Sequence, residues 1–444
     1  MLIVARPQPD LSIYNKDVKV SEKVMQYGEL QAFIEFKPDE LSDPFCDPPS
    51  FDMPCARLME FQFESATKKR TDCRGQLTSY ATEMLARQHR TRAFSIYIGD
   101  PCMRLIRWDC SGVVVTEKFN FRKDSQPLVD FLWYFGRASE AVRGRDTTAR
   151  NATREETKMA VRHLAQWKNE RERPVIVFDI QDGNRTREFI AWGSMADTES
   201  LTGRATRAYP VYEKATKKTY FLKDSWRAAS LERESDILRE LNEKGVRNVP
   251  TFVCGGDVVG HTTLSHKFAV EDVVEQEEGH EGDAQGSTGK RAVGGTTTDM
   301  ISGSKGVQKP RTTPGCIIEK RRKSWKCGIH NIGERIHHCF VEDFIGQHLD
   351  KFTSSKQFMQ VVLDAFIGMM TILRLLQAAQ LIIICLAHRD AYEKCNIVHR
   401  DVSARNVMMT ENDRGILNDW DLAKRFSEDA AQSVRQHERT ESPQ

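Results

Sequence analysis

The chain of 444 residues is long enough for two domains with a sizeable buried core. Its 39% hydrophobic and 29% charged residues are typical of a soluble globular protein, and a formal net charge of +2 favours neither a nucleic-acid nor a membrane partner. Eleven cysteines without a Cys-x-x-Cys pair indicate reduced thiols in a cytoplasmic or nuclear protein and argue against a zinc site.

Residues 1–140 are expected to form an N-terminal accessory α/β domain. Residues 31–37 alternate as a half-buried strand, and residues 76–86 carry apolar side chains on one helical face. Further strands are expected at residues 94–99, 102–108 and 112–116, and an apolar helix around residues 131–135.

Pro9, Asp10, Glu35 and Lys37 form a second pattern in this domain, with Gln76 and Tyr80 on the following helix. The order loosely resembles the PD-(D/E)xK nuclease fold, in which acidic residues hold a divalent cation on a phosphodiester and the lysine positions water. A strand with one Glu and one Lys on its solvent face gives the same pattern. An active nuclease, an inactive relic of that fold and an ordinary accessory domain therefore stay open.

Residues 141–175 are charged and helix-prone, which predicts a solvated connecting helix. Residues 176–264 are patterned as a strand-rich lobe, in which Gly203 opens a turn. A glycine turn can bring backbone N–H groups onto phosphates, although a single glycine makes a weak loop of this kind. Strands of this lobe and beyond it are expected at residues 175–178, 187–192, 209–212, 249–255 and 336–343.

An alternating strand at residues 219–226 contains Lys223 and is followed by a helix that begins near Glu234. The apolar residues of this helix come one turn after Glu234, so its carboxylate is suitably placed to form an ion pair with Lys223. Glu232 and Asp236 are near enough in the sequence to compete for that role.

Residues 265–325 interrupt the pattern with an acidic run and a segment rich in Gly, Thr and Ser that has no apolar period. Such a composition predicts a disordered insertion. It ends in the basic residues 320–326, which could serve as a nuclear-import or polyanion-binding patch or simply form a solvated strand edge.

Residues 366–387 are almost wholly apolar and are about as long as a membrane span. Arg374 stands near the middle of the segment, where a charge in lipid is costly. We therefore expect a buried helix, or an irregular insertion at residues 368–385 beside one, and no membrane association.

The most specific motif is His399-Arg400-Asp401, followed by Asn406 and, after a short apolar strand, by Asp419. Phosphoryl transfer needs one carboxylate near the acceptor hydroxyl and two oxygen ligands that hold Mg²⁺ on the ATP phosphates. Asp401 suits the first task, and Asn406 and Asp419 suit the second. Arg400 would place a fixed positive charge beside the loop.

With Asp419-Trp420-Asp421 in place of Asp-Phe-Gly, this motif resembles the fungal-type protein kinase family, and the resemblance covers about residues 25–426. It implies an α/β (α+β) fold in which the accessory domain precedes a bilobal kinase domain. ATP and Mg²⁺ would be the cofactors, Lys223 paired with Glu234 would hold the ATP phosphates, and Gly203 would lie in the loop that covers them. A protein substrate is implied, and nucleic acid is not expected as a partner.

Residues 326–426 are expected to supply only part of the second kinase lobe, because only a polar tail, residues 427–444, follows them. The chain therefore resembles a C-terminally truncated kinase. Three functions stay open. The first is ATP-dependent phosphorylation of protein Ser/Thr hydroxyls, which truncation could abolish. The second is a pseudokinase or nucleotide-binding interaction protein, and the third is a nucleic-acid-processing protein built on Glu35 and Lys37.

Overall fold

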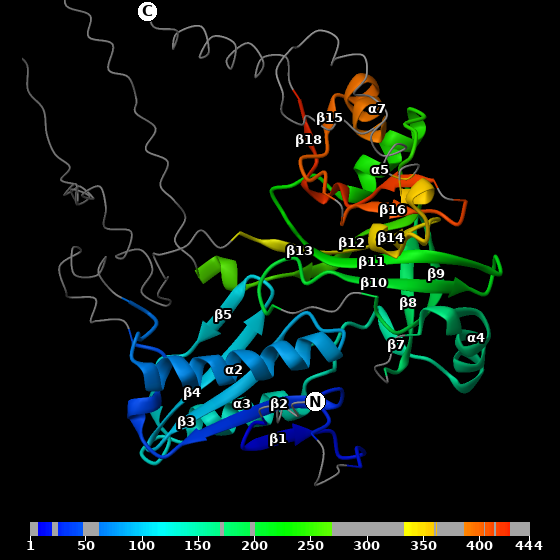
Figure 1. Ribbon diagram of the computed structural model, residues 1–444. Coiled ribbons are helices and arrows are strands. Elements are labelled where there is room, and N and C mark those ends of the chain that lie inside the picture. The colour runs from blue at the N-terminus through cyan, green and yellow to red at the C-terminus, as the bar shows by residue number, and fades with distance from the viewer. Residues whose placement is uncertain are drawn as a thin grey trace, which may run out of the picture. The chain divides into compact units, whose positions relative to one another are not determined.

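The computed structural model describes residues 8–19, 25–47, 62–168, 173–195, 200–268, 333–358, 361, 386–403, 405–412 and 414–426 (Figure 1). The described residues within 1–47, 64–267 and 332–444 belong to one compact unit. Most of the predicted insertion at 265–325, the apolar segment at 368–385 and the tail at 427–444 lie outside the described residues. In the part of the chain that is described, no helix is both long and apolar enough to cross a membrane.

The first sheet follows the predicted N-terminal strands. Its order is β1 (Leu11–Tyr14), β2 (Leu30–Lys37), β3 (Ala93–Gly99), β4 (Cys102–Asp109) and β5 (Gly112–Val115), and β6 (Phe119–Asn120) pairs with β4. β2 and β3 are parallel, whereas the other neighbours are antiparallel. The short helix η1 (Glu40–Ser42) follows β2, and α3 (Gln126–Arg137) follows the sheet.

Helix α2 (Lys68–Arg87) makes the crossover that a parallel strand pair requires, and it contacts both β2 and β3 (Figure 1). The apolar face predicted from the sequence is confirmed as the buried face of this helix. Its residues are Leu77, Tyr80, Ala81, Met84 and Leu85.

The second sheet has seven antiparallel strands in the order β12-β13-β11-β10-β9-β8-β7. Their bounds are β7 (Ala149–Asn151), β8 (Val175–Asp182), β9 (Arg185–Trp192), β10 (Arg207–Glu213), β11 (Lys218–Ala228), β12 (Phe252–Thr262) and β13 (Arg335–Glu342). The expected strand at 249–255 thus begins at Phe252 and is longer than predicted. The turn that contains Gly203 lies between β9 and β10, as expected.

Two expectations about the lobes differ from the structure. Helix α4 (Arg154–Leu164), with η2 (Ala165–Trp167), lies in the segment expected to be solvated, yet Ala160 and Leu164 are buried against β8, β9 and β10. β13 belongs to residues 326–426, which are expected in the second lobe, but it pairs with β11 and β12 in the second sheet. β13 forms backbone hydrogen bonds with a strand on each side, and these bonds hold it in the second sheet although it is distant in sequence from β11 and β12.

A hydrophobic core joins this sheet to the following elements. Helix α5 (Glu234–Glu243) contributes Ile237, Leu238 and Leu241, which pack with Phe340 of β13 and with Trp420. The remaining elements are α7 (Leu386–Cys395), β14 (Gln347–His348), β15 (Ile397–Val398), β16 (Val407–Met409), β17 (Gly415–Leu417), β18 (Lys424–Arg425), η3 (Ser265–Phe268), η5 (Leu349–Lys351) and η6 (Trp420–Leu422).

Truncating the apolar face of α5 tests this core. Leu241→Ala should lower the free energy of unfolding by about 2–5 kcal/mol, because Leu241 is fully buried and its removal leaves a cavity. Urea denaturation would measure the change. Leu41→Ala is the matched control, since Leu41 is 68% exposed and its loss should change the free energy by less than about 0.5 kcal/mol. Equal effects of the two substitutions would contradict the assignment of the core.

Candidate active site

Lys223 and Glu234 form a buried ion pair between the second sheet and helix α5. β11 places Lys223 opposite Phe340 of β13, and Glu234 is the first residue of α5. The Nζ atom of Lys223 lies 2.7 Å from Oε2 of Glu234, and both side chains are more than nine-tenths buried. The structure therefore brings together the two residues that the sequence suggested as a pair.

The two competing carboxylates are held elsewhere. Glu232 forms an ion pair with Arg425, at 2.7 Å, and Asp236 accepts hydrogen bonds from Arg233, the N-cap of α5, and from Arg239 within the helix. Neither contacts Lys223. The choice among the three carboxylates follows from where α5 begins, since its first residue faces β11.

Glu234 and Lys223 also bind the segment that follows the catalytic-loop motif. The second carboxylate oxygen of Glu234 accepts a hydrogen bond of 2.9 Å from the backbone N–H of Trp420. The ammonium of Lys223 forms an ion pair with Asp419, whose backbone is in the left-handed region at φ 64°. The strand, the helix and the Asp419-Trp420-Asp421 segment are thus joined at one ammonium group.

His399 fixes the catalytic loop from within the core. Its Nε2–H donates to the carbonyl oxygen of Asn418, at 2.9 Å, and its Nδ1 accepts from the backbone N–H of Asp401, at 3.3 Å. These two bonds are those of the neutral imidazole with its proton on Nε2. The ring is fully buried and meets the Trp420 ring edge to face, with centroids 4.5 Å apart. His399 therefore positions Asp401 but does not face solvent.

Asp401 and Asn406 are held through their backbone and amide groups. The Nδ2 of Asn406 donates to the carbonyl oxygen of Asp401, at 2.8 Å, which leaves the amide oxygen of Asn406 as a potential cation ligand. The half-exposed carboxylate of Asp401 forms no hydrogen bond or ion pair with the described residues. Arg400 is exposed, and its backbone is in the left-handed region at φ 69°.

Arg204 is a site residue that sequence reasoning missed. It follows Gly203, whose φ of +115° favours glycine and whose N–H donates to the carbonyl of Cys110. The Arg204 guanidinium forms an ion pair with Asp421 and lies 3.6 Å from Oδ2 of Asp419. The single glycine of the turn is therefore followed by a cation that reaches the two aspartates.

The site holds more negative than positive charge. Glu234, Asp419 and Asp421 face Lys223 and Arg204, so three carboxylates surround two cations. Burial disfavours the charge of Lys223, but the carboxylates outweigh it and raise its pKa. Burial, together with the nearby carboxylates of Asp419 and Asp421, raises the pKa of Glu234 to about 7, although Lys223 lowers it. Burial likewise raises the pKa of Asp421. A further cation would relieve this excess.

Glu342 is a second residue that the sequence did not reveal. It ends β13, is 1% exposed, and neither carboxyl oxygen accepts a hydrogen bond from the described residues. Burial, followed by the charge of Glu234, raises its pKa well above the usual value. Because an ionised carboxylate without a partner is costly to bury, these surroundings favour the neutral acid form of Glu342.

The N-terminal residues Asp10, Glu35 and Lys37 also lie close together. Glu35 and Lys37 form an ion pair, and Asp10 binds the backbone between them. Glu35 Oε1 lies 2.6 Å from Lys37 Nζ, and Asp10 Oδ2 accepts from the backbone N–H of Phe36, at 2.8 Å. The Tyr80 hydroxyl donates to the backbone carbonyl of residue 8. No group of three metal-ligating side chains forms around Glu35 among the described residues. This geometry gives no added support to a nuclease.

The family comparison covers both halves of the site. The family model described as "Fungal protein kinase" matches residues 55–381 and 368–442. The first match contains Lys223 and Glu234, and the second contains the motif from His399 to Asp419. The two matches share residues 368–381, inside the apolar segment that the sequence marked as an insertion. A search of curated proteins found no match.

Replacing Glu342 by its neutral isostere tests its protonation. The pKa of the Glu342 carboxyl is near 4.5 in the unfolded chain and is raised in the folded protein. Its contribution to the free energy of unfolding is therefore complete below about pH 4.5 and is lost as the pH rises through the folded-state pKa. The stability of Glu342→Gln relative to the wild type should therefore increase between about pH 4.5 and pH 8. Urea denaturation without nucleotide or Mg²⁺ would measure it. Glu243→Gln, exposed on α5, is the control, and the same trend in both variants would refute the assignment.

Proposed function

The chain belongs to the fungal protein kinase family, and from this membership and the geometry of the site we propose that it transfers a phosphoryl group from ATP to protein Ser or Thr hydroxyls. The observation that supports this most strongly is the buried contact of Lys223 with both Glu234 and Asp419. A lysine held by a helical glutamate beside a metal-binding aspartate is the arrangement that phosphoryl transfer by protein kinases requires.

The donor set fits Mg²⁺. Asp419 and the amide oxygen of Asn406 are hard oxygen ligands, and the excess negative charge around Lys223 favours a cation. Mg²⁺ bound there would neutralise charge on the ATP phosphates. Lys223 would bind the phosphates from the sheet side, and Arg204 would add a second cation from the turn after Gly203.

Asp401 is the proposed general base. Its backbone is fixed by His399 and by Asn406, while its carboxylate makes no bond to the described residues. It can therefore accept the proton of a substrate hydroxyl as that oxygen attacks the γ-phosphorus and ADP departs. Arg400 would hold positive charge near the same loop. Most of the rate enhancement would come from positioning, so His399 contributes by orienting Asp401.

A nucleotide-binding pseudokinase is the second candidate. The observation that favours it is that Asp419, the expected Mg²⁺ ligand, already contacts Lys223 and lies near Arg204. If these cations keep Asp419 occupied, the chain would bind nucleotide without transferring phosphate. Both candidates share the nucleotide site, and they differ in turnover.

Asp401→Asn tests turnover. It should reduce transfer of labelled phosphate from ATP to the chain itself or to a generic Ser/Thr substrate by about 10²–10⁴-fold, because the general base is lost. Binding of Mg-ATP should be retained. Glu411→Gln is the control, since Glu411 is exposed after β16 and has no role in the proposed mechanism. Wild-type transfer that Asp401→Asn leaves unchanged would remove Asp401 from the mechanism, and binding without transfer would favour the pseudokinase.

Asp419→Asn tests the metal site separately. ATP at about 100 times its Kd should stabilise the wild-type chain by about 2.7 kcal/mol in the presence of Mg²⁺, and much less in EDTA. The variant should lose this dependence on Mg²⁺, whereas Asp236→Asn on α5 should keep it. Thermal unfolding would measure both. A response to Mg²⁺ that survives in Asp419→Asn would contradict the assigned ligand.

A further inference from the structure

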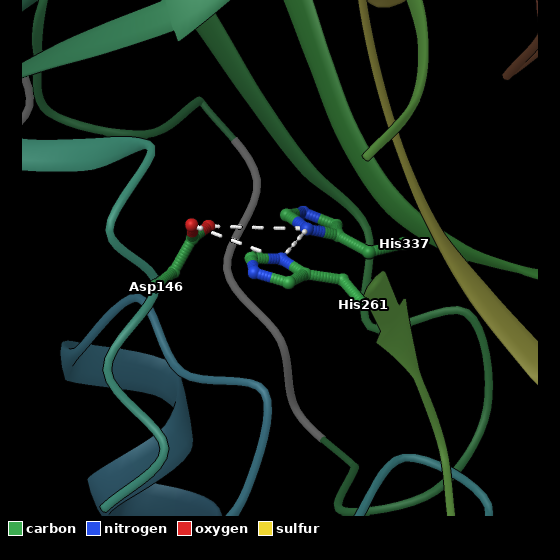
Figure 2. A group of neighbouring side chains, drawn as sticks. All are labelled: Asp146, His261 and His337. Atoms are coloured by element: carbon green, nitrogen blue, oxygen red, sulfur yellow. Dashed lines mark hydrogen bonds and ion pairs between the residues drawn. The ribbon is translucent and has the colours of Figure 1, made fainter. Parts of the chain in front are cut away.

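A second cluster of functional side chains lies outside the proposed active site. Asp146 stands just before β7, His261 lies near the end of β12, and His337 belongs to β13. Asp146 and His337 are buried, and His261 is half-buried. Figure 2 shows the carboxylate and the two imidazole rings turned toward one another. The proposed kinase chemistry uses none of the three.

Three ligand atoms converge in this cluster. The Nδ1 atoms of His261 and His337 are 3.1 Å apart, and each lies 3.8 Å from one oxygen of the Asp146 carboxylate (Figure 2). A tetrahedral ion with bonds of about 2.0–2.1 Å holds its ligand atoms roughly 3.3–3.4 Å apart. One ion could therefore bridge all three atoms after shifts of a few tenths of an ångström.

Asp224 orients the ring of His337. The Nε2 atom of His337 lies 2.5 Å from Oδ1 of Asp224, which places a proton on Nε2 and, in the neutral ring, leaves the lone pair of Nδ1 facing His261. The Trp226 ring stacks on His337 with centroids 5.0 Å apart. A histidine that binds a metal commonly donates its other N–H to a carboxylate, as His337 does here.

Asp146 is also held in place for binding. Its Oδ1 accepts hydrogen bonds from the backbone N–H and the hydroxyl of Thr148, at 2.9 Å and 2.6 Å. Its distance of 3.8 Å to each imidazole nitrogen is too long for a direct hydrogen bond. Two buried carboxylates, Asp146 and Asp224, share the neighbourhood with one buried guanidinium, Arg207.

We propose that Asp146, His261 and His337 bind one zinc ion, with a water molecule as the fourth ligand. Two imidazoles and a carboxylate favour zinc over Mg²⁺, so this site is distinct from that of Mg-ATP. Its role is structural, because its ligands come from the segment before β7 and from two strands of the second sheet. β13 pairs with β11, so the ion would brace the strand that carries Lys223, from the opposite face.

Metal titration of the full chain tests the proposal. The wild type should bind one equivalent of Zn²⁺ and unfold at a higher temperature with the ion than with a chelator. Co²⁺ should give the visible absorption of a four-coordinate ion without a thiolate charge-transfer band. His261→Gln, at the half-buried ligand, should weaken zinc binding at least about 100-fold, the upper end of what loss of a supporting residue costs.

Two further variants separate ligand loss from unfolding. His266→Gln is the matched control, because His266 contacts Thr263 but lies outside the cluster, and it should bind zinc as the wild type does. Asp146→Asn keeps the size of the side chain and should also bind zinc more weakly. The proposal is overturned if the wild type binds no stoichiometric zinc or if the Co²⁺ spectrum shows thiolate ligation. It is also overturned if folded His261→Gln binds zinc with wild-type affinity. The Zn²⁺ and Co²⁺ titrations of the wild type test the proposed site even if none of the variants folds.

Discussion

The buried ammonium of Lys223 is the interaction on which the architecture of the site depends. It meets Glu234 from α5 and Asp419 from the segment after the catalytic loop, and Glu234 in turn binds the backbone of Trp420. A strand, the helix that follows it and a segment much farther along the chain therefore share one charge. Because an unpaired buried charge is costly, loss of any one partner would destabilise the placement of the others.

Charge imbalance links this architecture to the proposed chemistry. The site contains more carboxylates than cations, and burial near Glu234 raises the pKa of Glu342, whose carboxyl oxygens accept no hydrogen bond from the described residues. A stable fold without ligands would gain from fewer acids at this place. A divalent cation would balance the charge of Asp419, and nucleotide phosphates would balance Lys223 and Arg204. The acidic residues are therefore compatible with a stable site when both ligands are bound.

Local patterns predicted the elements well, whereas contacts between distant segments were out of reach. The spacing of Leu77 to Leu85 predicted the buried face of α2, and the alternation around Lys223 predicted β11. The sequence favoured Glu234 as the partner of Lys223 and left Glu232 and Asp236 as competitors, because the choice depends on where α5 begins. In α4, abundant charges obscured the stripe of Ala160 and Leu164. Arg204, Glu342 and the cluster of Asp146 with two histidines have no short spacing that a sequence pattern could detect.

A double-mutant cycle between Lys223→Met and Glu234→Gln tests the central claim most directly. The free energies of unfolding of the wild type, both single variants and the double variant would be measured by urea denaturation. If the two side chains form a buried pair that organises the site, their coupling energy should be about 1–3 kcal/mol. Changes that add to within about 0.5 kcal/mol would show that the two residues do not interact, and the account of the site would fail.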